Sequence, residues 1–327
     1  MQKKVVSSLE YENAAGRIYD IQGYAVHDGP GIRTTVYTKG CPLSCLWCHS
    51  PESQSFEFQV GYLSLKCLGV DLCENTCIKA CDQGALSAGE PEEAMDGSGL
   101  IRKVRIDRTK CNECQKCAEV CINKALYTAG WDTDVDEVYE RLMKDVPFFK
   151  NGGGVTISGG EAMSQFPFTY NLAKRLKDSG IHICLDTTGF ANTEQFRQII
   201  PYVDLFLYDL KQMDSDMHKK LAGVPNEKIL ENARFIAANG GKLQVRYPVI
   251  PRLNDSEENM HATAKFCKEL GDAVTLVQLL PYHHLGTSKY ERLGRKYKMH
   301  RWSPPSEEFM QKALEIFKSY DLPCQLH

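Results

Sequence analysis

Three cysteines within eight residues constrain what this chain can fold into more than any other feature. They are Cys41, Cys45 and Cys48, within the sequence KGCPLSCLWCHSPE, and no fourth cysteine follows nearby. Thiolates at this spacing predict a [4Fe–4S] cluster in which one iron is left open to an outside ligand. The alternatives are a zinc site or three unrelated thiols, but structural zinc sites take four ligands, usually from two separated pairs. The spacing therefore favours a reactive cluster, because catalytic metal sites keep one position free.

The composition indicates a soluble protein of a reducing compartment. The 327 residues are 43% hydrophobic and 25% charged, with a formal net charge of -3. These values give no electrostatic case for nucleic acid or an anionic membrane as a partner. The N-terminus lacks the apolar core of a signal peptide, and no apolar run reaches transmembrane length. We therefore expect a cytoplasmic monomer whose cysteines are reduced and free to bind metal.

Eight further cysteines form two quartets. The first quartet is Cys67, Cys73, Cys77 and Cys81. The second is Cys111, Cys114, Cys117 and Cys121, and it has the spacing of bacterial ferredoxins. In two-cluster ferredoxins the last cysteine of each run crosses to the other cluster, so we expect Cys121 to complete the first cluster and Cys81 the second. Zinc is again the alternative, although a quartet this tight has poor zinc spacing.

Short β-type runs alternate with helical stretches over the rest of the chain. Strands are expected at 16–22, 34–38, 155–158, 181–185, 203–207, 243–247 and 274–280. Helices are expected at 134–142, 168–178, 194–200, 229–238 and 257–270. About six β/α units, where a complete barrel has eight, predict an α/β fold with a partial (β/α)6 TIM-type barrel. We expect residues 16–60 and 130–327 to form this barrel, and residues 61–129 to be an inserted ferredoxin-like domain with two clusters.

Polar motifs stand at the carboxyl ends of these strands, where a β/α barrel collects its site. In Ser158-Gly159-Gly160-Glu161 the glycines let the backbone approach a ligand, and the carboxylate can accept hydrogen bonds from an ammonium group. Asp186-Thr187-Thr188-Gly189 and Asp209-Leu210-Lys211 follow the next two strands, and Lys211 can pair with a carboxylate. Leu279-Leu-Pro-Tyr-His283 ends the last strand. Taken singly, each motif fits a plain turn or a solvated loop equally well.

Taken together, these segments resemble the activating enzymes of glycyl radical enzymes, a group of radical S-adenosylmethionine (SAM) enzymes that includes the pyruvate formate-lyase activator. The resemblance is carried by Asp28-Gly-Pro-Gly-Ile-Arg33, Trp47-Cys48-His49, Asp186-Thr187-x-Gly189, Asp209-Leu-Lys-Gln-Met213, Val245-Arg246-Tyr247 and Leu280-Pro-Tyr-His283-x-Leu-Gly286. It covers nearly the whole chain from Gly16 onward. The insert is a departure from the pyruvate formate-lyase activator, and relatives that carry it activate several other glycyl radical enzymes. The resemblance does not choose among these, because an activator touches a glycine loop and never the partner's substrate.

The resemblance also implies roles for individual residues. An electron from the first cluster cleaves SAM, and the resulting 5'-deoxyadenosyl radical takes the α-hydrogen of a glycine in the partner enzyme. The implied catalytic residues are Cys41, Cys45, Cys48 and Lys211. The implied SAM-binding residues are Trp47, Cys48, His49, Gly159, Gly160, Glu161, Asp186, Asp209, Leu210, Lys211 and His283. Asp186, Thr187 and Asp209 are further implied to hold a monovalent cation near the SAM carboxylate. The implied cofactors are three [4Fe–4S] clusters and SAM, and the implied electron donor is flavodoxin or ferredoxin.

Two other functions stay open at this point. A radical SAM enzyme that acts on a small molecule would form its product without any partner protein. An electron carrier built on the two ferredoxin-like clusters would keep passing electrons when Cys45 is replaced by alanine. An activating enzyme would lose SAM cleavage on the same substitution.

Overall fold

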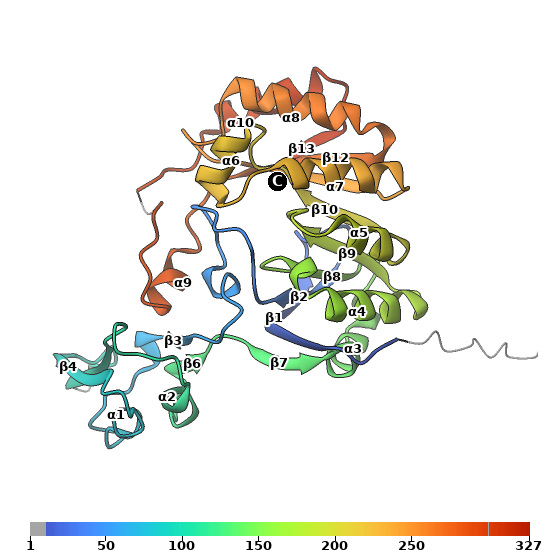
Figure 1. The fold of residues 1–327 in the computed structure, drawn as a ribbon. Coiled ribbons are helices and arrows are strands. Elements are labelled where there is room, and N and C mark those ends of the chain that lie inside the picture. The colour runs from blue at the N-terminus through green and yellow to red at the C-terminus, as the bar shows by residue number, and fades with distance from the viewer. Residues whose placement is uncertain (1–10, 98, 300) are drawn as a thin grey trace, which may run out of the picture.

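A nine-stranded sheet dominates the structure, a computed structural model that describes residues 11–97, 99–299 and 301–327. The strand order is β13-β12-β11-β10-β9-β8-β2-β1-β7 (Figure 1). The strands are β1 (Ala15–Ala25), β2 (Arg33–Thr38), β7 (Trp131–Asp134), β8 (Gly154–Gly159), β9 (His182–Thr187), β10 (Leu205–Asp209), β11 (Leu243–Val249), β12 (Val274–Pro281) and β13 (Cys324–Leu326). All neighbours from β2 to β13 run parallel, whereas β1 is antiparallel to β2 and β7. The chain is thus an α/β protein with a mostly parallel sheet.

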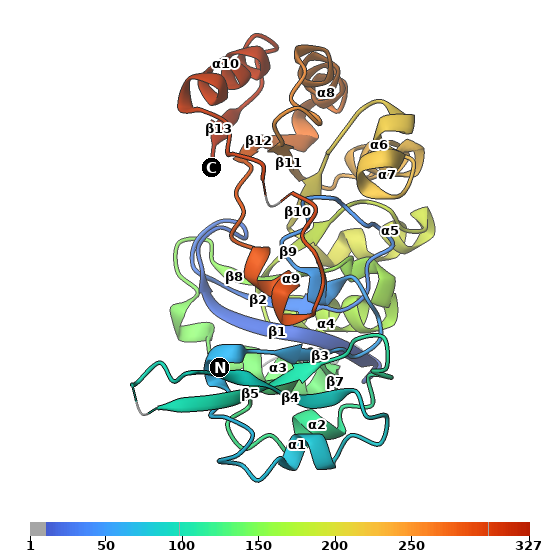
Figure 2. The same cartoon turned by 90° about the vertical axis from the view of Figure 1, so that its left-hand side faces the viewer.

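Helices follow the strands along the chain, and those whose side chains enter the main hydrophobic core pack on the sheet (Figure 2). They are α3 (Val135–Met143), α4 (Phe166–Asp178), α5 (Thr193–Ile199), α6 (Ser215–Ala222), α7 (Glu227–Ala238), α8 (Glu257–Glu269), α9 (Thr287–Arg292) and α10 (Glu307–Lys318). Short 3-10 turns lie at η1 (Pro51–Ser53), η2 (Ser64–Lys66), η3 (Val146–Phe148), η4 (Ala162–Gln165), η5 (Ile200–Tyr202) and η6 (Gly271–Ala273). Side-chain caps fix several helix starts, as where Asp134 accepts a hydrogen bond from the Glu137 N–H at 2.9 Å. No helix in the described ranges is long and apolar enough to cross a membrane.

The strands expected from the sequence are present, each within about three residues of its expected bounds. The five expected helices are present as α3, α4, α5, α7 and α8. Sequence reasoning missed β7, β13, α6, α9 and α10. The strands β7 and β13 have only four and three residues, so their identity as strands depends on pairing with β1 and β12 rather than on local pattern.

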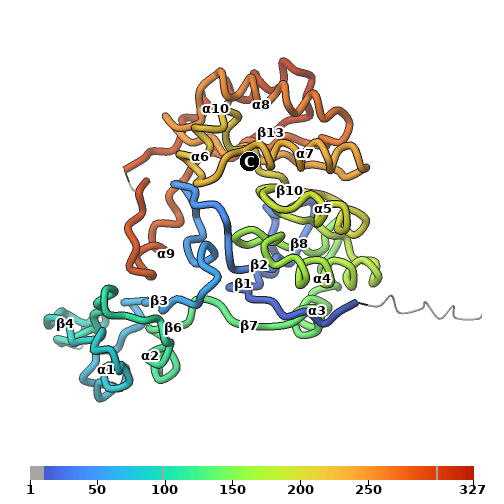
Figure 3. The backbone as a smooth tube through the Cα atoms, viewed as in Figure 1, coloured from blue at the N-terminus to red at the C-terminus, as the bar shows by residue number. Residues whose placement is uncertain are grey.

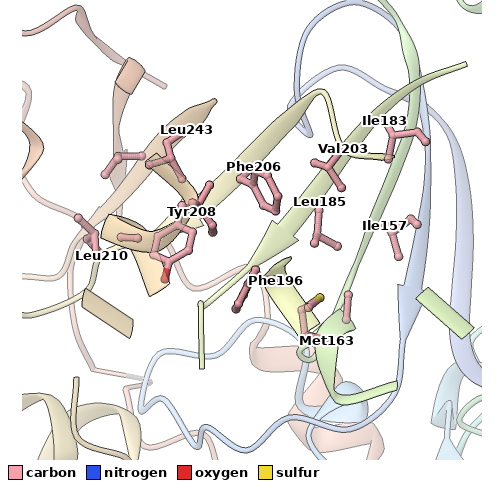
Figure 4. Close-up of a cluster of buried hydrophobic side chains, with 14 of the residues drawn as sticks. Ile157, Met163, Ile183, Leu185, Phe196, Val203, Phe206, Tyr208, Leu210 and Leu243 are labelled. Carbon is pink, nitrogen blue, oxygen red and sulfur yellow. The ribbon is translucent and has the colours of Figure 1, made fainter. Parts of the chain in front are cut away.

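Alternation along the parallel strands separates the core from the site. In β8, Val155 and Ile157 belong to the main hydrophobic core, which α4, α5, α7, α8 and α10 also enter. The same core takes Ile183 and Leu185 from β9 and Phe206 and Tyr208 from β10 (Figure 4). Because successive side chains of a strand point to opposite faces, the residues between these ones face away from that core. In β8 these are Thr156 and, one position beyond Ile157, Ser158.

Residues 60–128 form a smaller body with its own core (Figure 3). Its elements are β3 (Val60–Tyr62), α1 (Thr76–Lys79), β4 (Leu86–Glu93), β5 (Leu100–Ile106), α2 (Lys116–Glu119) and β6 (Leu126–Thr128). β3 pairs with β6, and β4 pairs with β5, both antiparallel. Val60, Val70, Leu86, Val104 and Leu126 are its most buried aliphatic residues. Two of the quartet cysteines pack among them, so this body folds around its cysteines.

Candidate active site

A cavity of about 520 Å³ opens at the carboxyl ends of the parallel strands. The loop that carries Cys41, Cys45 and Cys48 lines one part of it, and the ends of β8, β9, β10 and β12 line another. The residues expected in the site that line this cavity are Cys41, Cys45, Trp47, Cys48, His49, Gly159, Gly160, Asp186, Asp209, Lys211 and His283. Segments far apart in the sequence therefore meet at one place, as the carboxyl ends of parallel strands do in a barrel.

The backbone of the cysteine loop is held from two sides. The Ser44 N–H donates to the carbonyl of Ala222 at 2.8 Å, at the carboxyl end of α6. The hydroxyl of Tyr290, on α9, donates to the carbonyl of Cys48 at 3.0 Å. Neither contact uses a thiol. These two contacts therefore fix the loop through its backbone, and all three cysteines line the cavity.

Burial raises the pKa of all three thiols. For Cys45 burial raises the pKa to about 12, although the Lys211 ammonium opposes the shift. Burial also raises the pKa of Cys41 and Cys48. These sulfurs thus need the positive charge of a bound metal to ionise, since a coordinating thiol is deprotonated.

The described side chains do not converge on a single metal ion. Among residues 11–97, 99–299 and 301–327, no group of three or more His, Cys, Asp or Glu side chains is placed to hold one. A zinc ion needs its ligands to meet at one point, about 2.3 Å from each sulfur. An iron–sulfur cluster takes one thiolate on each iron and needs no such convergence. A cluster on Cys41, Cys45 and Cys48 is therefore compatible with this finding.

A glycine turn forms the wall of the cavity at the end of β8. Gly159 has a φ of +128°, and a Cβ added there would lie 2.2 Å from the backbone nitrogen of Thr38 on β2. At Gly160 an added Cβ would lie 2.4 Å from the carbonyl oxygen of Gly40. Both positions therefore require glycine. The turn exposes backbone, rather than side chains, to the cavity.

Glu161 does not line the cavity, although it was expected to bind SAM. Its side chain is fully buried and accepts hydrogen bonds from Thr187 Oγ1 at 2.7 Å, from the Thr188 N–H at 2.8 Å and from Thr188 Oγ1 at 2.5 Å. The Met163 N–H donates to it as well, at 3.1 Å. Burial raises the pKa of Glu161, while these donors oppose the shift. These hydrogen bonds connect the turn after β8 to the turn after β9, so the Glu161 carboxylate supports the cavity wall without lining the cavity.

A network of buried charges forms the polar wall of the cavity. Asp186 accepts a hydrogen bond from Ser158 Oγ at 2.7 Å, and Arg246 Nη1 lies 3.3 Å from its carboxylate. Asp28 accepts from Tyr37 OH at 2.9 Å and lies 3.8 Å from Arg246 Nη2. Burial raises the pKa of Asp186, an effect that Arg246 opposes. Arg246 Nε is buried without a hydrogen-bond partner, so this guanidinium has unused donor capacity at the cavity.

Lys211 supplies a second positive charge at the cavity. Its ammonium pairs with the carboxylate of Asp209, and only 8% of its side chain is exposed. Burial alone would lower the pKa of Lys211, but Asp209, Cys45 and Asp186 together outweigh burial and raise the pKa. The lysine is therefore charged at any physiological pH. Leu210, between these two residues, is buried and does not line the cavity.

Two histidines form a flat surface in the lining of the cavity. The rings of His49 and His283 stack at a centroid distance of 4.0 Å and an interplanar angle of 24°. A ring nitrogen of His49 also lies 2.8 Å from the carbonyl oxygen of His283. Burial lowers the pKa of His49 to about 4, and burial lowers that of His283 as well. Both rings are thus neutral near pH 7 and can stack against another flat, uncharged group.

The two quartets of the smaller body surround two separate cavities. One cavity, of about 100 Å³, is lined by Cys67, Cys73, Cys77 and Cys121. The other is lined by Cys81, Cys111, Cys114 and Cys117. Each set therefore holds three cysteines of one quartet and the last cysteine of the other. Burial raises the pKa of Cys77 and of Cys117 to about 11, as it does for the thiols of the main cavity.

Several residues of the main cavity were not singled out as site residues from the sequence. Polar residues among them are Asp28, Tyr37, Ser158 and Arg246. All but Asp28 lie on β2, β8 or β11 at positions that face away from the core. The alternation of side chains along a strand is the sequence signal that could have identified these residues. A polar residue that follows an apolar core residue in a buried parallel strand points to the opposite face of the sheet, which here faces the cavity.

Comparison with known proteins supplies an independent view of this site. Residues 114–264 match the family model described as the radical SAM superfamily, and residues 27–110 match that of a 4Fe-4S single cluster domain. The chain is 40% identical over 298 residues to the isethionate sulfite-lyase activating enzyme of Nitratidesulfovibrio vulgaris, which covers 90% of this chain and 92% of that protein. It is 36% identical over 310 residues to the indoleacetate decarboxylase activating enzyme of Tractidigestivibacter scatoligenes, covering 94% of this chain and 96% of that protein.

A solved structure is similar to part of the chain. It is a domain of pyruvate-formate lyase-activating enzyme from Bacteroides vulgatus, with 33% sequence identity and a TM-score of 0.46. The match covers 54% of this chain and 99% of that one.

Proposed function

Because this chain belongs to the radical SAM activating enzymes of glycyl radical enzymes, we propose that the main cavity is where it binds SAM beside an iron–sulfur cluster. The enzyme is an oxidoreductase that installs a glycyl radical in a partner enzyme. When bound, the cluster supplies the electron that cleaves SAM to methionine and the 5'-deoxyadenosyl radical, which takes the α-hydrogen of the partner's glycine. The single observation that carries the placement is that the three cysteines and the strand-end motifs line one cavity.

The donor set of the cavity fits a cluster with one open iron. Cys41, Cys45 and Cys48 would hold three irons, and no further cysteine lines this cavity among the described residues. Lys211 lies close enough to Cys45 to oppose the rise in the thiol pKa that burial causes. A cationic neighbour favours the thiolate form, so the lysine would help the loop to bind metal.

The remaining lining residues provide complementary groups for each part of SAM. The Gly159–Gly160 turn offers backbone to the methionine amino group, and the Lys211 ammonium offers charge to the methionine carboxylate. Asp186 and Asp209, with Thr187, would hold a monovalent cation beside that carboxylate. The stacked imidazoles of His49 and His283 offer a flat neutral surface to the adenosine, beside Trp47. Glu161 and Leu210 would support these contacts from outside the cavity.

The smaller body would hold two further [4Fe–4S] clusters, which makes three in all. The first would take Cys67, Cys73, Cys77 and Cys121, and the second Cys81, Cys111, Cys114 and Cys117. Their grouping around two cavities supports this assignment. We propose that residues 61–129 are a ferredoxin-like insert that relays electrons from flavodoxin or ferredoxin.

The open sheet suits a protein substrate. We propose that 16–60 and 130–327 form a partial (β/α)6 barrel, since β13 and β7 are the two edges of the sheet and do not pair with each other. An open side admits a loop of protein, whereas a closed barrel would admit only a metabolite. The loop at 29–31 would form part of the docking edge, next to Asp28 in the cavity. Cytoplasmic localisation and a monomeric state stay predictions.

A comparison of two cysteine variants tests this assignment. Anaerobically reconstituted Cys45→Ala should form no 5'-deoxyadenosine from SAM and dithionite, whereas Cys324→Ala, near the carboxyl end of the chain, should form it at the wild-type rate. With a glycyl radical enzyme added, the wild type should also give the glycyl radical signal in electron paramagnetic resonance. Equal SAM cleavage by both variants would contradict the assignment of the cluster. Turnover of a small molecule without any partner protein would contradict the assignment of the substrate.

A further inference from the structure

An exposed apolar surface surrounds the mouth of the first quartet cavity. Leu68, Leu72 and Ile122 are 54%, 75% and 78% exposed, and all of them line the cavity together with four cysteines. We refer to these three residues as the outer patch. The core of the smaller body consists of other residues, among them Val70 and Leu126, so folding does not account for the outer patch. Large aliphatic side chains grouped at the surface are typical of a binding site.

The second quartet faces the main sheet, which leaves the first quartet outermost. Arg108, three residues before Cys111, donates to the carbonyl of Val60 at 2.7 Å and to the carbonyl of Arg292 in α9 at 3.1 Å. α9 also carries Tyr290, which holds the Cys48 carbonyl. Contacts thus run from the second quartet to the loop of the active-site cysteines. In Figures 1 and 2, α1, which carries Cys77 of the first quartet, lies farther from the main sheet than α2.

Positive charge accompanies the outer patch. Lys66 lines the same cavity and is exposed, and its carbonyl accepts a hydrogen bond from Asn123 Nδ2 at 2.7 Å. Lys124 follows Asn123 and is exposed as well. Asp71 lies in the same segment, but its carboxylate is paired with Arg102 at 3.0 Å. The surface is therefore apolar at its centre, with two exposed lysines and the exposed Glu74 near its rim. The lysines suit a partner with an acidic rim.

We propose that the outer patch is the docking site of the electron donor, a small redox protein with an acidic surface around its redox group. This inference rests on the proposed function, because it requires a cluster on Cys67, Cys73, Cys77 and Cys121. A docked reduced flavodoxin would lose one electron, and its hydroquinone would become the semiquinone. The first-quartet site would gain that electron, passing from the 2+ to the 1+ state, with no bond made or broken in this chain. The electron would then move inward through the second quartet toward Cys41, Cys45 and Cys48.

Substitution of the apolar centre tests the proposal. Leu72→Gln with Ile122→Gln should raise the apparent Kd for reduced flavodoxin about tenfold or more, as truncation of central interface residues does. Stopped-flow absorbance would measure the rate of cluster reduction by flavodoxin, and calorimetry would measure binding. Reduction by dithionite, and SAM cleavage driven by it, should match the wild type. Met95→Gln is the matched control, because Met95 is 77% exposed on the same body but does not line the cavity.

Substitution of the rim tests the role of charge separately. Lys66→Gln with Lys124→Gln should slow association with flavodoxin at low salt and should weaken the salt dependence of the rate.

Four results would overturn the proposal. The first is an unchanged Kd for flavodoxin in the Leu72→Gln, Ile122→Gln variant, and the second is an equal loss of flavodoxin affinity in Met95→Gln. The third is a change in the oligomeric state of the Leu72→Gln, Ile122→Gln variant. The fourth is that this variant loses binding of the glycyl radical enzyme instead of flavodoxin. Failure of the proposed function would look different, because wild-type protein reduced by dithionite would then form no 5'-deoxyadenosine.

Discussion

Replacement of Arg33 by methionine tests how a buried residue outside the cavity lining supports the strands and the loop that form the cavity. Arg33 has no exposed surface, and its Nε donates to Thr156 Oγ1 at 2.7 Å. Its Nη2 donates to the Val155 carbonyl at 2.6 Å and its Nη1 to the Pro30 carbonyl at 3.0 Å. Further bonds reach backbone carbonyls after η3 and in β9. Burial lowers the pKa of this guanidinium, because burial disfavours its charged form. The hydrogen bonds to neutral acceptors offset this cost of burying the charge.

The expected loss of stability follows from these contacts. Removal of one partner from a buried charged network costs about 3–5 kcal/mol. Methionine also removes the buried charge itself, so we expect a value at the lower end, about 3 kcal/mol. At 2–4 °C for each kcal/mol, the apparent melting temperature should fall by roughly 6–12 °C.

The same substitution should affect the partner reaction more than SAM cleavage. Thr156 Oγ1, which accepts from Arg33, donates to the carbonyl of Asp28 at 2.6 Å. Arg33 thus holds the loop at 28–31 on which the proposed docking edge depends. Below the melting transition, glycyl radical formation should drop several-fold more than 5'-deoxyadenosine formation without partner.

Anaerobic thermal unfolding of Arg33→Met, followed by circular dichroism, measures the stability change. Arg234→Met is the matched control, because Arg234 is exposed and its ion pair with Glu269 is 4.0 Å long. The control should change stability by no more than about 0.5 kcal/mol. A loss below about 1 kcal/mol for Arg33→Met, or a loss equal to that of the control, would refute the reasoning.

Three further predictions follow from single residues. Gly189→Ala should destabilise the protein by about 2–4 kcal/mol, because the new Cβ would lie 1.7 Å from Tyr208 OH and residue 189 has a φ of +77°. Thermal unfolding would measure this loss of stability. Glu161→Gln should cost about 1–3 kcal/mol through unpaired donors at Thr187 and Thr188, with little change in the SAM Kd measured by calorimetry; a large change in Kd would indicate direct contact. Cys77→Ser should reduce the iron content by about a third while dithionite-driven SAM cleavage persists, and loss of all iron would contradict separate clusters.

The parallel strands and the place of the site could be predicted from the sequence. Runs such as 155–158 and 243–247 are apolar and β-branched, and the motifs after them had to meet because parallel strands end at one edge. That rule needs no knowledge of long-range contacts. It brought Gly159, Asp186 and Lys211 to one cavity from three separate segments.

The orientation of individual side chains could not be predicted in the same way. Glu161 follows the glycine turn directly, but its carboxylate is drawn away from the cavity by donors at Thr187 and Thr188. Those donors lie on another strand end, so only the packed structure reveals the competition. The support of the cysteine loop by Ala222 and Tyr290 is equally non-local. Arg246 was visible as part of a motif, yet its ion pair with Asp186 depends on the register of strands that are not adjacent in sequence.

Electron paramagnetic resonance of the reduced protein, recorded before and after addition of SAM, tests the central claim most directly. Cys77→Ser, Cys117→Ser protein is the best sample, because its remaining signal should come from the cluster on Cys41, Cys45 and Cys48. SAM should change the line shape of that signal, and 5'-deoxyadenosine and methionine should accumulate together. An unchanged spectrum with no 5'-deoxyadenosine would contradict an open iron at these cysteines.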